Sequence, residues 1–263
     1  MIRKIIILLV LLSVNSLAVE LLLFKPLTAN PFEARTGFLF QSANGSLRLD
    51  IGASYDLLNF KTAGMKSSVG ADFFTYTRLR HEGNFKFPVE TSDYFFGLNY
   101  AIKFDWKKQS FIRFRLAHIS SHLVDGYTDN VNNFIREPIV FSREFIDLVF
   151  AQYVNGFRYY LGLNYIFSII PKTPNRVAPQ LGFDNEITIN DYLYLVSGID
   201  FKLIGIDNVW RGNTAVQFGL KFVTSSNYGI FVGAYYYQGR SMHGQFFNDL
   251  EKYFGLGFQL LFL

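Results

Sequence analysis

Apolar side chains recur at every second position along most of this chain, and this period constrains the fold more than any other feature. The clearest example is the stretch DYFFGLNYAIKFD, residues 93–105. One face of it carries Tyr94, Phe96, Leu98, Tyr100, Ile102 and Phe104, and the other carries Asp93, Gly97, Asn99, Lys103 and Asp105. A period of two predicts β-strands whose two faces meet different environments.

The composition of the two faces favours a membrane barrel over a soluble sandwich. The polar face of a sandwich would be rich in Lys and Glu, whereas here it is largely Gly, Ser, Asn and Tyr with paired charges. Aromatic residues make up 18% of the chain, with 30 Phe and 16 Tyr. A barrel in lipid can turn that surface outward, partly as aromatic belts. We therefore predict an all-β fold, a transmembrane antiparallel up-and-down β-barrel.

Turn residues divide the barrel region into about twelve strands. The expected strands are residues 35–42, 46–58, 66–79, 92–105, 109–120, 141–154, 156–168, 181–188, 191–203, 211–223, 227–238 and 251–263. Turns after even-numbered strands are short, as at Asn155-Gly156, and most loops after odd-numbered strands are long, as at 121–140. Short periplasmic turns and long outer loops are typical of outer-membrane barrels.

The N-terminus has the features of a secretory signal peptide. Two basic residues precede an apolar run from Ile5 to Leu12, and small residues precede a cleavage point after Ala18. The run is shorter than the ~20 apolar residues of a spanning helix, which argues against a permanent anchor. We expect a signal peptide over 1–18, a periplasmic N-terminal segment over 19–34 and an outer-membrane barrel over 35–263, in a Gram-negative-type bacterium.

Composition excludes several kinds of site and partner, and the C-terminus indicates one partner. The absence of cysteine excludes a disulfide framework and a thiolate metal site. The net charge of +4 is modest and scattered, so no nucleic-acid partner is expected. A last strand that ends in an aromatic residue resembles the signal read by the barrel assembly machinery. This chain ends Phe262-Leu263, so its aromatic residue is one place early. That machinery is an expected partner.

The fifth and sixth expected strands carry the residues that most resemble a catalytic site. A register that keeps the apolar residues of both strands on the lipid side places Arg115 opposite Asp147, as an ion pair in the lumen. The same register gives two outward-facing pairs at the outer rim: His118 with Glu144, and Ser120 with Ser142.

The chemistry of these rim residues supports two interpretations. An imidazole can take the proton of a nearby serine hydroxyl, and a carboxylate on its other nitrogen orients the ring. Ser120 would then be the nucleophile, His118 the base and Glu144 the orienting acid, acting on an ester at the depth of lipid headgroups. In the structural interpretation, they are polar residues at strand ends, where contact with headgroups costs little.

His118-Ile119-Ser120 is similar to the His-x-Ser pair on the outer face of the outer-membrane acyl hydrolases, namely outer-membrane phospholipase A and the lipid A 3-O-deacylases. In those families an Asn or a Glu completes the site, so the resemblance leaves Asn132 and Glu144 as candidates. The Asn-Gly that follows the phospholipase serine is replaced by Ser121-His122. This departure limits the resemblance to a few residues.

Most of the chain resembles an uncharacterised family of bacterial envelope proteins with a domain of unknown function. The resemblance rests on PLTANPFEAR near the expected mature start, HISSHLVDGY, FSRE after the long loop, and GQFF before YFGLGF. It implies an exported barrel and no particular activity.

All four histidines and several cationic side chains fall near the outer end of the expected barrel. The candidate binding residues, for lipopolysaccharide phosphates or for substrate capture, are Arg80, His81, His122, Asp125, Arg143 and His243. The alternative for His122 and Asp125 is a loop folded over the barrel mouth. No cofactor is indicated, and calcium as an alternative would need more oxygen ligands than this stretch supplies by itself.

The leading functional hypothesis is an envelope-lipid acyl-ester hydrolase whose partner is an outer-membrane lipid or lipopolysaccharide. The alternatives are a narrow channel or ligand-binding barrel, and a structural envelope protein without turnover. The charged residues expected in the lumen predict a mutually neutralised network, which is more typical of a structural than of a conducting lumen: Arg48, Asp50, Lys103, Arg113, Arg115, Asp147, Arg158, Asp200 and Lys202.

Overall fold

The computed structural model describes residues 22–42, 45–105, 108–129, 131–224 and 228–262. The expected signal peptide and the last residue lie outside these ranges. The strands are β1 (Thr36–Gln41), β2 (Ser46–Thr62), β3 (Met65–Arg80), β4 (Val89–Asp105), β5 (Gln109–Leu123), β6 (Phe141–Val154), β7 (Phe157–Ile170), β8 (Val177–Asn190), β9 (Leu193–Ile206), β10 (Val209–Val223), β11 (Tyr228–Arg240) and β12 (Leu250–Phe262). Two short 3-10 turns are η2 (Asp125–Tyr127) and η3 (Gly244–Phe246).

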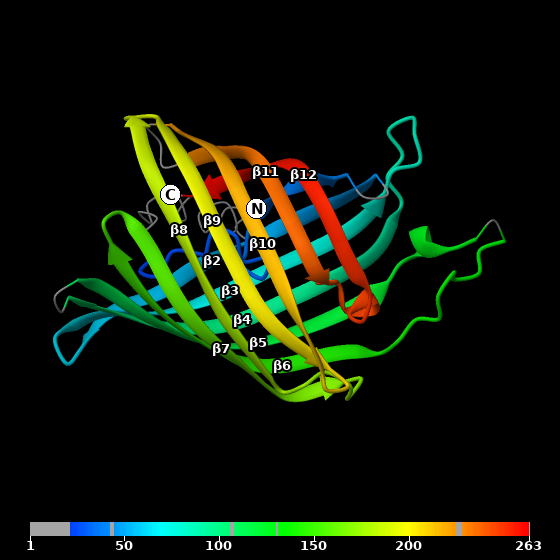
Figure 1. The fold of residues 1–263 in the computed structure, drawn as a ribbon, viewed down its shortest axis with the longest axis horizontal. Helices are drawn as coiled ribbons and strands as arrows, with labels where there is room; N and C mark the ends of the chain where they lie inside the picture. Colours follow the sequence, from blue (N-terminus) through cyan, green and yellow to red (C-terminus); the bar gives the residue numbers. More distant parts are fainter. Residues whose placement is uncertain (1–21, 43–44, 106–107, 130, 225–227, 263) are drawn as a thin grey trace, which may run out of the picture.

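These strands form one closed antiparallel barrel (Figure 1), in which each strand pairs with its neighbours in the chain and β1 pairs with β12. The predicted fold class and the predicted strand number are confirmed. Among the described residues, no helix is long and apolar enough to cross a membrane.

The largest difference in strand boundaries concerns β8. The sequence predicted a strand over 181–188, whereas β8 runs from Val177 to Asn190. Pro179 lies within it, opposite Leu163 of β7. A proline cannot donate to the strand ladder and is a signal against a strand, so the turn-based assignment began after it.

The outward face of the barrel is a continuous apolar wall. Exposed side chains on it include Leu98 on β4, Leu116 on β5, Leu148 on β6 and Leu161 on β7, with exposed fractions of 44–64%. Soluble proteins rarely expose contiguous apolar surface of this extent, whereas a barrel in lipid requires it. The alternation in the sequence therefore corresponds to a lipid-facing surface and an enclosed lumen.

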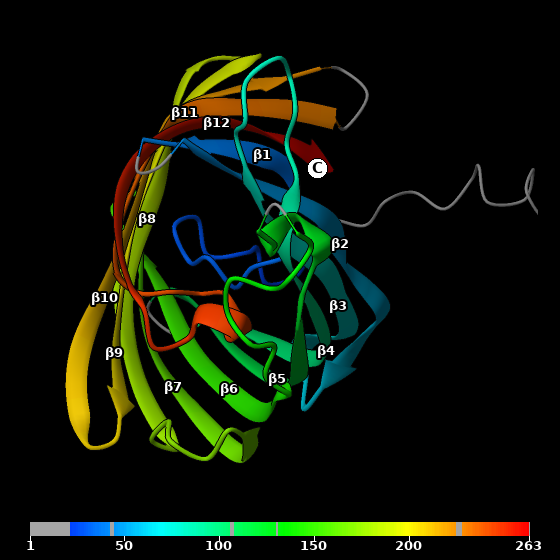
Figure 2. The ribbon, with the colours of Figure 1, turned by 90° about the vertical axis from the view of Figure 1, so that its right-hand side faces the viewer.

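The N-terminal segment, residues 22–35, lies inside the lumen (dark blue in Figure 2). Glu33 forms two hydrogen bonds to Arg113, at 2.6 and 2.8 Å, and Lys202 Nζ donates to Asn30 Oδ1 at 2.7 Å. The expectation that this segment extends into the periplasm is therefore corrected. Its polar groups form hydrogen bonds and ion pairs with buried cations of the lumen. A buried cation without such a partner would destabilise the fold.

The expected lumen network is present and is larger than the sequence indicated. Arg115 Nη2 lies 2.7 Å from Asp147 Oδ2, as the register predicted. Arg48 pairs with Asp50 at 2.7 Å. Two acids that were not predicted also take part, because Glu33 binds Arg113 and Asp184 binds Arg158 at 2.6 Å.

The outer half of the lumen also holds an apolar core. Phe74, Tyr76 and Phe95 point inward and are completely buried, and Phe32 of the N-terminal segment packs against this cluster. The lumen is therefore a packed interior built around residues 22–35.

Candidate functional site

The candidate site lies at the outer ends of β5 and β6, on the outward face. Leu116 pairs with Ile146, so His118 lies opposite Glu144 in the register that the sequence predicted. Nδ1 of His118 lies 2.9 Å from Oε1 of Glu144, which is hydrogen-bond distance. The two side chains are 40% and 29% exposed, so a molecule outside the barrel can reach the pair.

Two serines hold the carboxylate of Glu144 in place. Ser142 Oγ donates to Oε1 of Glu144 at 2.6 Å, and Ser168 of β7 also hydrogen-bonds to this carboxylate. The register of β6 against β7 shifts directly after Glu144, and such bulges often re-aim side chains near active sites. The carboxylate is therefore oriented before any substrate arrives.

Ser120 follows His118 by two positions on the same face of β5, and it lies opposite Ser142. Cα atoms two residues apart on a strand are about 7 Å apart, so both side chains face the same region. Among the described residues, neither Ser120 Oγ nor His118 Nε2 has a hydrogen-bond partner. The nucleophile and the base of the expected triad are thus neighbours without a direct contact.

Aromatic and aliphatic side chains surround these polar groups. On β4, Tyr94 lies opposite Ser120 and Phe96 lies opposite His118, and the rings of Phe96 and His118 are 6.4 Å apart. The lipid-facing Leu98 and Leu116 continue the wall toward the periplasm. The site therefore lies where the apolar wall meets the polar outer rim.

Glu144, and not Asn132, contacts His118. Asn132 lies in the loop between β5 and β6 with a φ of 63°, and its backbone N–H donates to the carbonyl of Asp129 at 3.1 Å. The resemblance to the acyl hydrolases left these two residues open as the third member, and the structure brings only Glu144 to the imidazole.

Four candidate binding residues lie at the outer end as expected: Arg80, His81, His122 and Asp125. Arg80 is already paired with two glutamates, at 2.6 and 3.3 Å. His122 is exposed, and its ring lies 5.9 Å from that of Tyr94, beside the candidate site. His122 is therefore the one of these four that lies closest in register to Ser120.

The other two candidate binding residues, Arg143 and His243, also lie at the outer end of the barrel, but their side chains point into it. Arg143 stacks on the rings of Phe32 and Phe145, at 5.2 and 5.0 Å. His243 is 1% exposed, and its Nδ1 lies 2.8 Å from Oδ2 of Asp93. The loop between β11 and β12 carries His243 inward, and strand period alone does not predict loop direction.

That loop, residues 241–249, folds over part of the outer mouth of the barrel (Figure 2). Gln245 is 2% exposed, and its side-chain amide donates to the backbone carbonyls of Ser121 and Ile139, both at 2.8 Å. Arg136 of the β5–β6 loop binds Asp249 at 2.7 Å. The outer loops therefore bond to one another over the lumen.

We expect the protein to show no steady ion conductance in planar lipid bilayers. The loop at the mouth and the segment 22–35 in the lumen both obstruct a path for hydrated ions. The measurement is single-channel recording with the purified full-length protein. Long-lived openings of uniform conductance would contradict this expectation and would favour the channel hypothesis.

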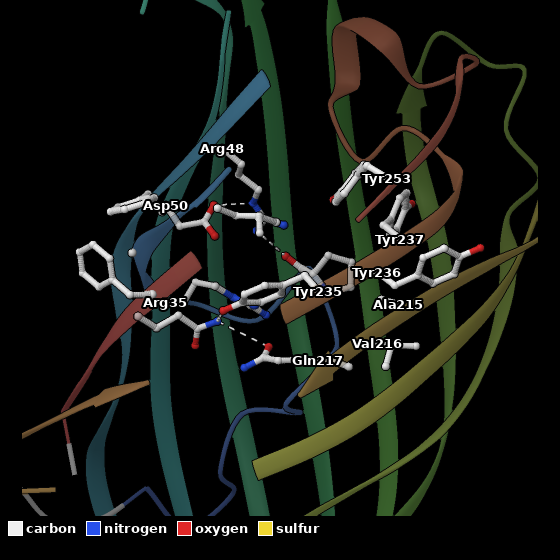
Figure 3. Close-up of a pocket in the computed structure, with 17 residues that line it drawn as sticks. Arg35, Arg48, Asp50, Ala215, Val216, Gln217, Tyr235, Tyr236, Tyr237 and Tyr253 are labelled. Carbon is white, nitrogen blue, oxygen red and sulfur yellow. Dashed lines mark hydrogen bonds and ion pairs between the residues drawn. The ribbon is translucent and has the colours of Figure 1, made fainter. Parts of the chain in front are cut away.

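A small pocket lies beside the N-terminal segment. Its volume is about 30 Å³, enough for about two water molecules. Figure 3 shows the side chains around it, which include Arg35, Arg48, Asp50, Gln217, Tyr235, Tyr237 and Tyr253. This polar pocket has no room for a larger solute.

The donor set near Ser120 does not fit calcium. Calcium takes six to eight oxygen ligands, whereas Glu144 supplies one carboxylate that His118 and two serines already engage. No group of three or more His, Asp or Glu side chains placed to hold a metal occurs among the described residues.

The closed barrel, its apolar wall and its periplasmic turns define an outer-membrane β-barrel protein. The chain belongs to the family described as "Protein of unknown function (DUF1207)", whose model matches residues 9–262. This agrees with the resemblance to a bacterial envelope family. No curated relative matches the sequence.

Solved structures with the same fold include outer-membrane phospholipases. The chain is similar to outer membrane phospholipase A from Escherichia coli, with 12% identity, a TM-score of 0.55, and coverage of 90% of this chain and 93% of that one. It is also similar to the calcium-bound dimer of the Salmonella typhi outer membrane phospholipase, with 12% identity, a TM-score of 0.56, and coverage of 92% and 96%. At this identity, the likeness shows the fold alone.

Proposed function

We propose that this protein is an envelope-lipid acyl-ester hydrolase with Ser120 as nucleophile, His118 as base and Glu144 as orienting acid. The observation that carries the proposal is the 2.9 Å hydrogen bond between His118 Nδ1 and Glu144. This bond uses Nδ1 of the imidazole, and Nε2 has no hydrogen-bond partner among the described residues. The outward-facing Ser120 lies two residues further along the same strand. The ester groups of membrane lipids lie at the level of the outer rim of such a barrel.

The reaction has two halves. Ser120 Oγ attacks the ester carbonyl carbon while His118 Nε2 accepts the hydroxyl proton, and this proton then passes to the leaving alcohol as the ester C–O bond breaks. Water attacks the resulting acyl-serine and gives a proton to His118, which passes it to Ser120 Oγ as the acyl C–O bond breaks and the fatty acid leaves. Glu144 accepts the hydrogen bond of Nδ1–H, which fixes the tautomer and stabilises the imidazolium.

The surroundings of the site support a lipid substrate. Acyl chains can lie along Phe96, Leu98 and Leu116 while the ester group stays at the polar rim. Two solved structures of similar fold are named outer membrane phospholipases, so this fold is compatible with such a reaction. The substrate is therefore an acyl ester of an outer-membrane phospholipid or of lipopolysaccharide, and we expect the barrel assembly machinery to insert the chain.

The test is release of fatty acid by the purified protein in mixed micelles. Phospholipid and lipid A are supplied in separate reactions, each with added calcium and each with a chelator. We expect release from at least one substrate, in both conditions, because the donor set near Ser120 does not fit calcium. No release from either substrate in either condition would contradict the proposal.

Ser142→Ala is expected to slow this hydrolysis about tenfold to a hundredfold, because a hydrogen bond to a charged group is worth about 1.5–3 kcal/mol. Ser142 Oγ donates to the Glu144 carboxylate, and no hydrogen bond joins Ser142 to Ser120 or His118 among the described residues. The measurement is kcat for fatty acid release. Ser46→Ala, at the outer end of β2, is the control and should keep the wild-type rate. Equal rates for both variants would exclude a positioning role for Ser142.

A further inference from the structure

The barrel wall has a notch on its periplasmic side, where β1 begins. Thr36, the first residue of β1, pairs with Leu260 of β12, and the chain before it turns into the lumen. β2 continues to Thr62, but its pairing with β1 ends at Asp50. From Ala53 onward, β2 has no strand neighbour on this side in the described part of the chain.

A cavity of about 580 Å³ connects this notch with the periplasmic half of the lumen. Its lining includes Ala53 and Ser54 on the β2 edge and Leu261 on the β12 edge. Its volume is within the range of about 300–1,000 Å³ that is typical of small-molecule sites. A molecule in the inner-facing leaflet can therefore reach the lumen from the side.

Apolar side chains form part of the inner wall of this cavity. Leu27 of the N-terminal segment, Val196 of β9 and Phe231 of β11 line it and are 1%, 8% and 2% exposed. The paired charges of Arg158 and Asp184, 2.6 Å apart, line the same cavity. An apolar surface of this kind favours a hydrocarbon chain over water.

Cationic side chains lie at the same cavity. Lys25 is exposed and has no carboxylate partner among the described residues, and it lines the cavity together with Lys221. Lys221 is bound by Glu186 at 2.5 Å. Arg35 donates to the backbone carbonyls of the N-terminal segment and has no described carboxylate partner at salt-bridge distance. An anionic group in the cavity could form a charge-assisted hydrogen bond with Lys25.

We propose that this cavity binds an amphiphile with one acyl chain and an anionic head group, which enters through the notch between β2 and β12. The acyl chain lies against Leu27, Val196 and Phe231, and the head group lies at Lys25. A free fatty acid and a lysophospholipid share this chemistry. The site is at the opposite end of the barrel from Ser120 and does not depend on hydrolysis.

The experiment measures binding of spin-labelled stearate to the full-length protein in lipid nanodiscs, by electron paramagnetic resonance. We expect a saturable, strongly immobilised signal at about one label per chain. Val196→Trp fills the cavity and should weaken binding at least about tenfold. Unlabelled palmitate and an unlabelled lysophosphatidylglycerol are then added separately as competitors, and the better competitor identifies the source of the ligand.

A second variant separates recognition of the head group from folding. Lys25→Ala removes one exposed charge and should weaken stearate binding about threefold to fivefold, the size of a surface ion pair. Binding of the uncharged methyl ester of the same label should be unchanged, and Lys86→Ala in an outer loop is the control. No saturable signal, or equal binding by wild type, Val196→Trp and Lys25→Ala, would overturn the proposal.

Discussion

Ser120→Ala is expected to reduce fatty acid release at least about a thousandfold, because removal of the nucleophile leaves only the binding contribution to catalysis. His118→Ala should cause a loss of similar size. The double variant should be no slower than either single variant, because residues that act as one unit are not additive. The measurement is kcat for the lipid ester that the wild type hydrolyses best.

The control for this prediction is Ser92→Ala. Ser92 lies on the outward face of β4 at the same rim, where its hydroxyl bonds to Thr77 at 3.3 Å and does not contact His118. This variant should keep wild-type activity. If Ser120→Ala releases fatty acid as fast as Ser92→Ala does, Ser120 is not the nucleophile.

Glu33→Gln is expected to lower the free energy of unfolding by about 3–5 kcal/mol, the usual cost of breaking a buried ion pair. Glu33 is 1% exposed, and its carboxylate accepts two hydrogen bonds from the guanidinium of Arg113. In the variant, Arg115 retains its ion pair with Asp147 at 2.7 Å, whereas Arg113 would be left without a carboxylate partner. The measurement is urea unfolding of the refolded protein in lipid vesicles.

Glu82→Gln is the matched control for Glu33→Gln. Glu82 pairs with Arg80 at 2.6 Å, but its side chain is 43% exposed, and exposed pairs contribute about 0–1 kcal/mol. Equal losses for the two variants would show that residues 22–35 are not bound in the lumen as the structure has them.

The barrel and the pairing of β5 with β6 could be predicted because strand period and lipid exposure are coupled. A shift of one residue would turn every side chain to the opposite face. The register in which Leu116 faces Ile146 keeps the apolar side chains of both strands outward, and it places His118 opposite Glu144. The same period underlies the agreement of most strand boundaries.

The contents of the lumen could not be predicted in the same way. Residues 22–35 have no strand period, and their position depends on long-range contacts such as Glu33 with Arg113. The inward course of the loop that carries His243 depends on Asp93, 150 residues earlier in the chain. Ser168 became part of the site through the irregular register beside Glu144. No local pattern in the sequence marks these contacts.

The central claim is that Ser120 is an activated nucleophile, and covalent labelling tests it most directly. The folded protein in micelles is treated with a serine-reactive fluorophosphonate that bears a long alkyl chain, and the modified residue is located by peptide mass spectrometry. The account predicts one label per chain, on Ser120, and its loss in His118→Ala. Absence of labelling, or labelling spread over other serines with Ser120 unmodified, would contradict it.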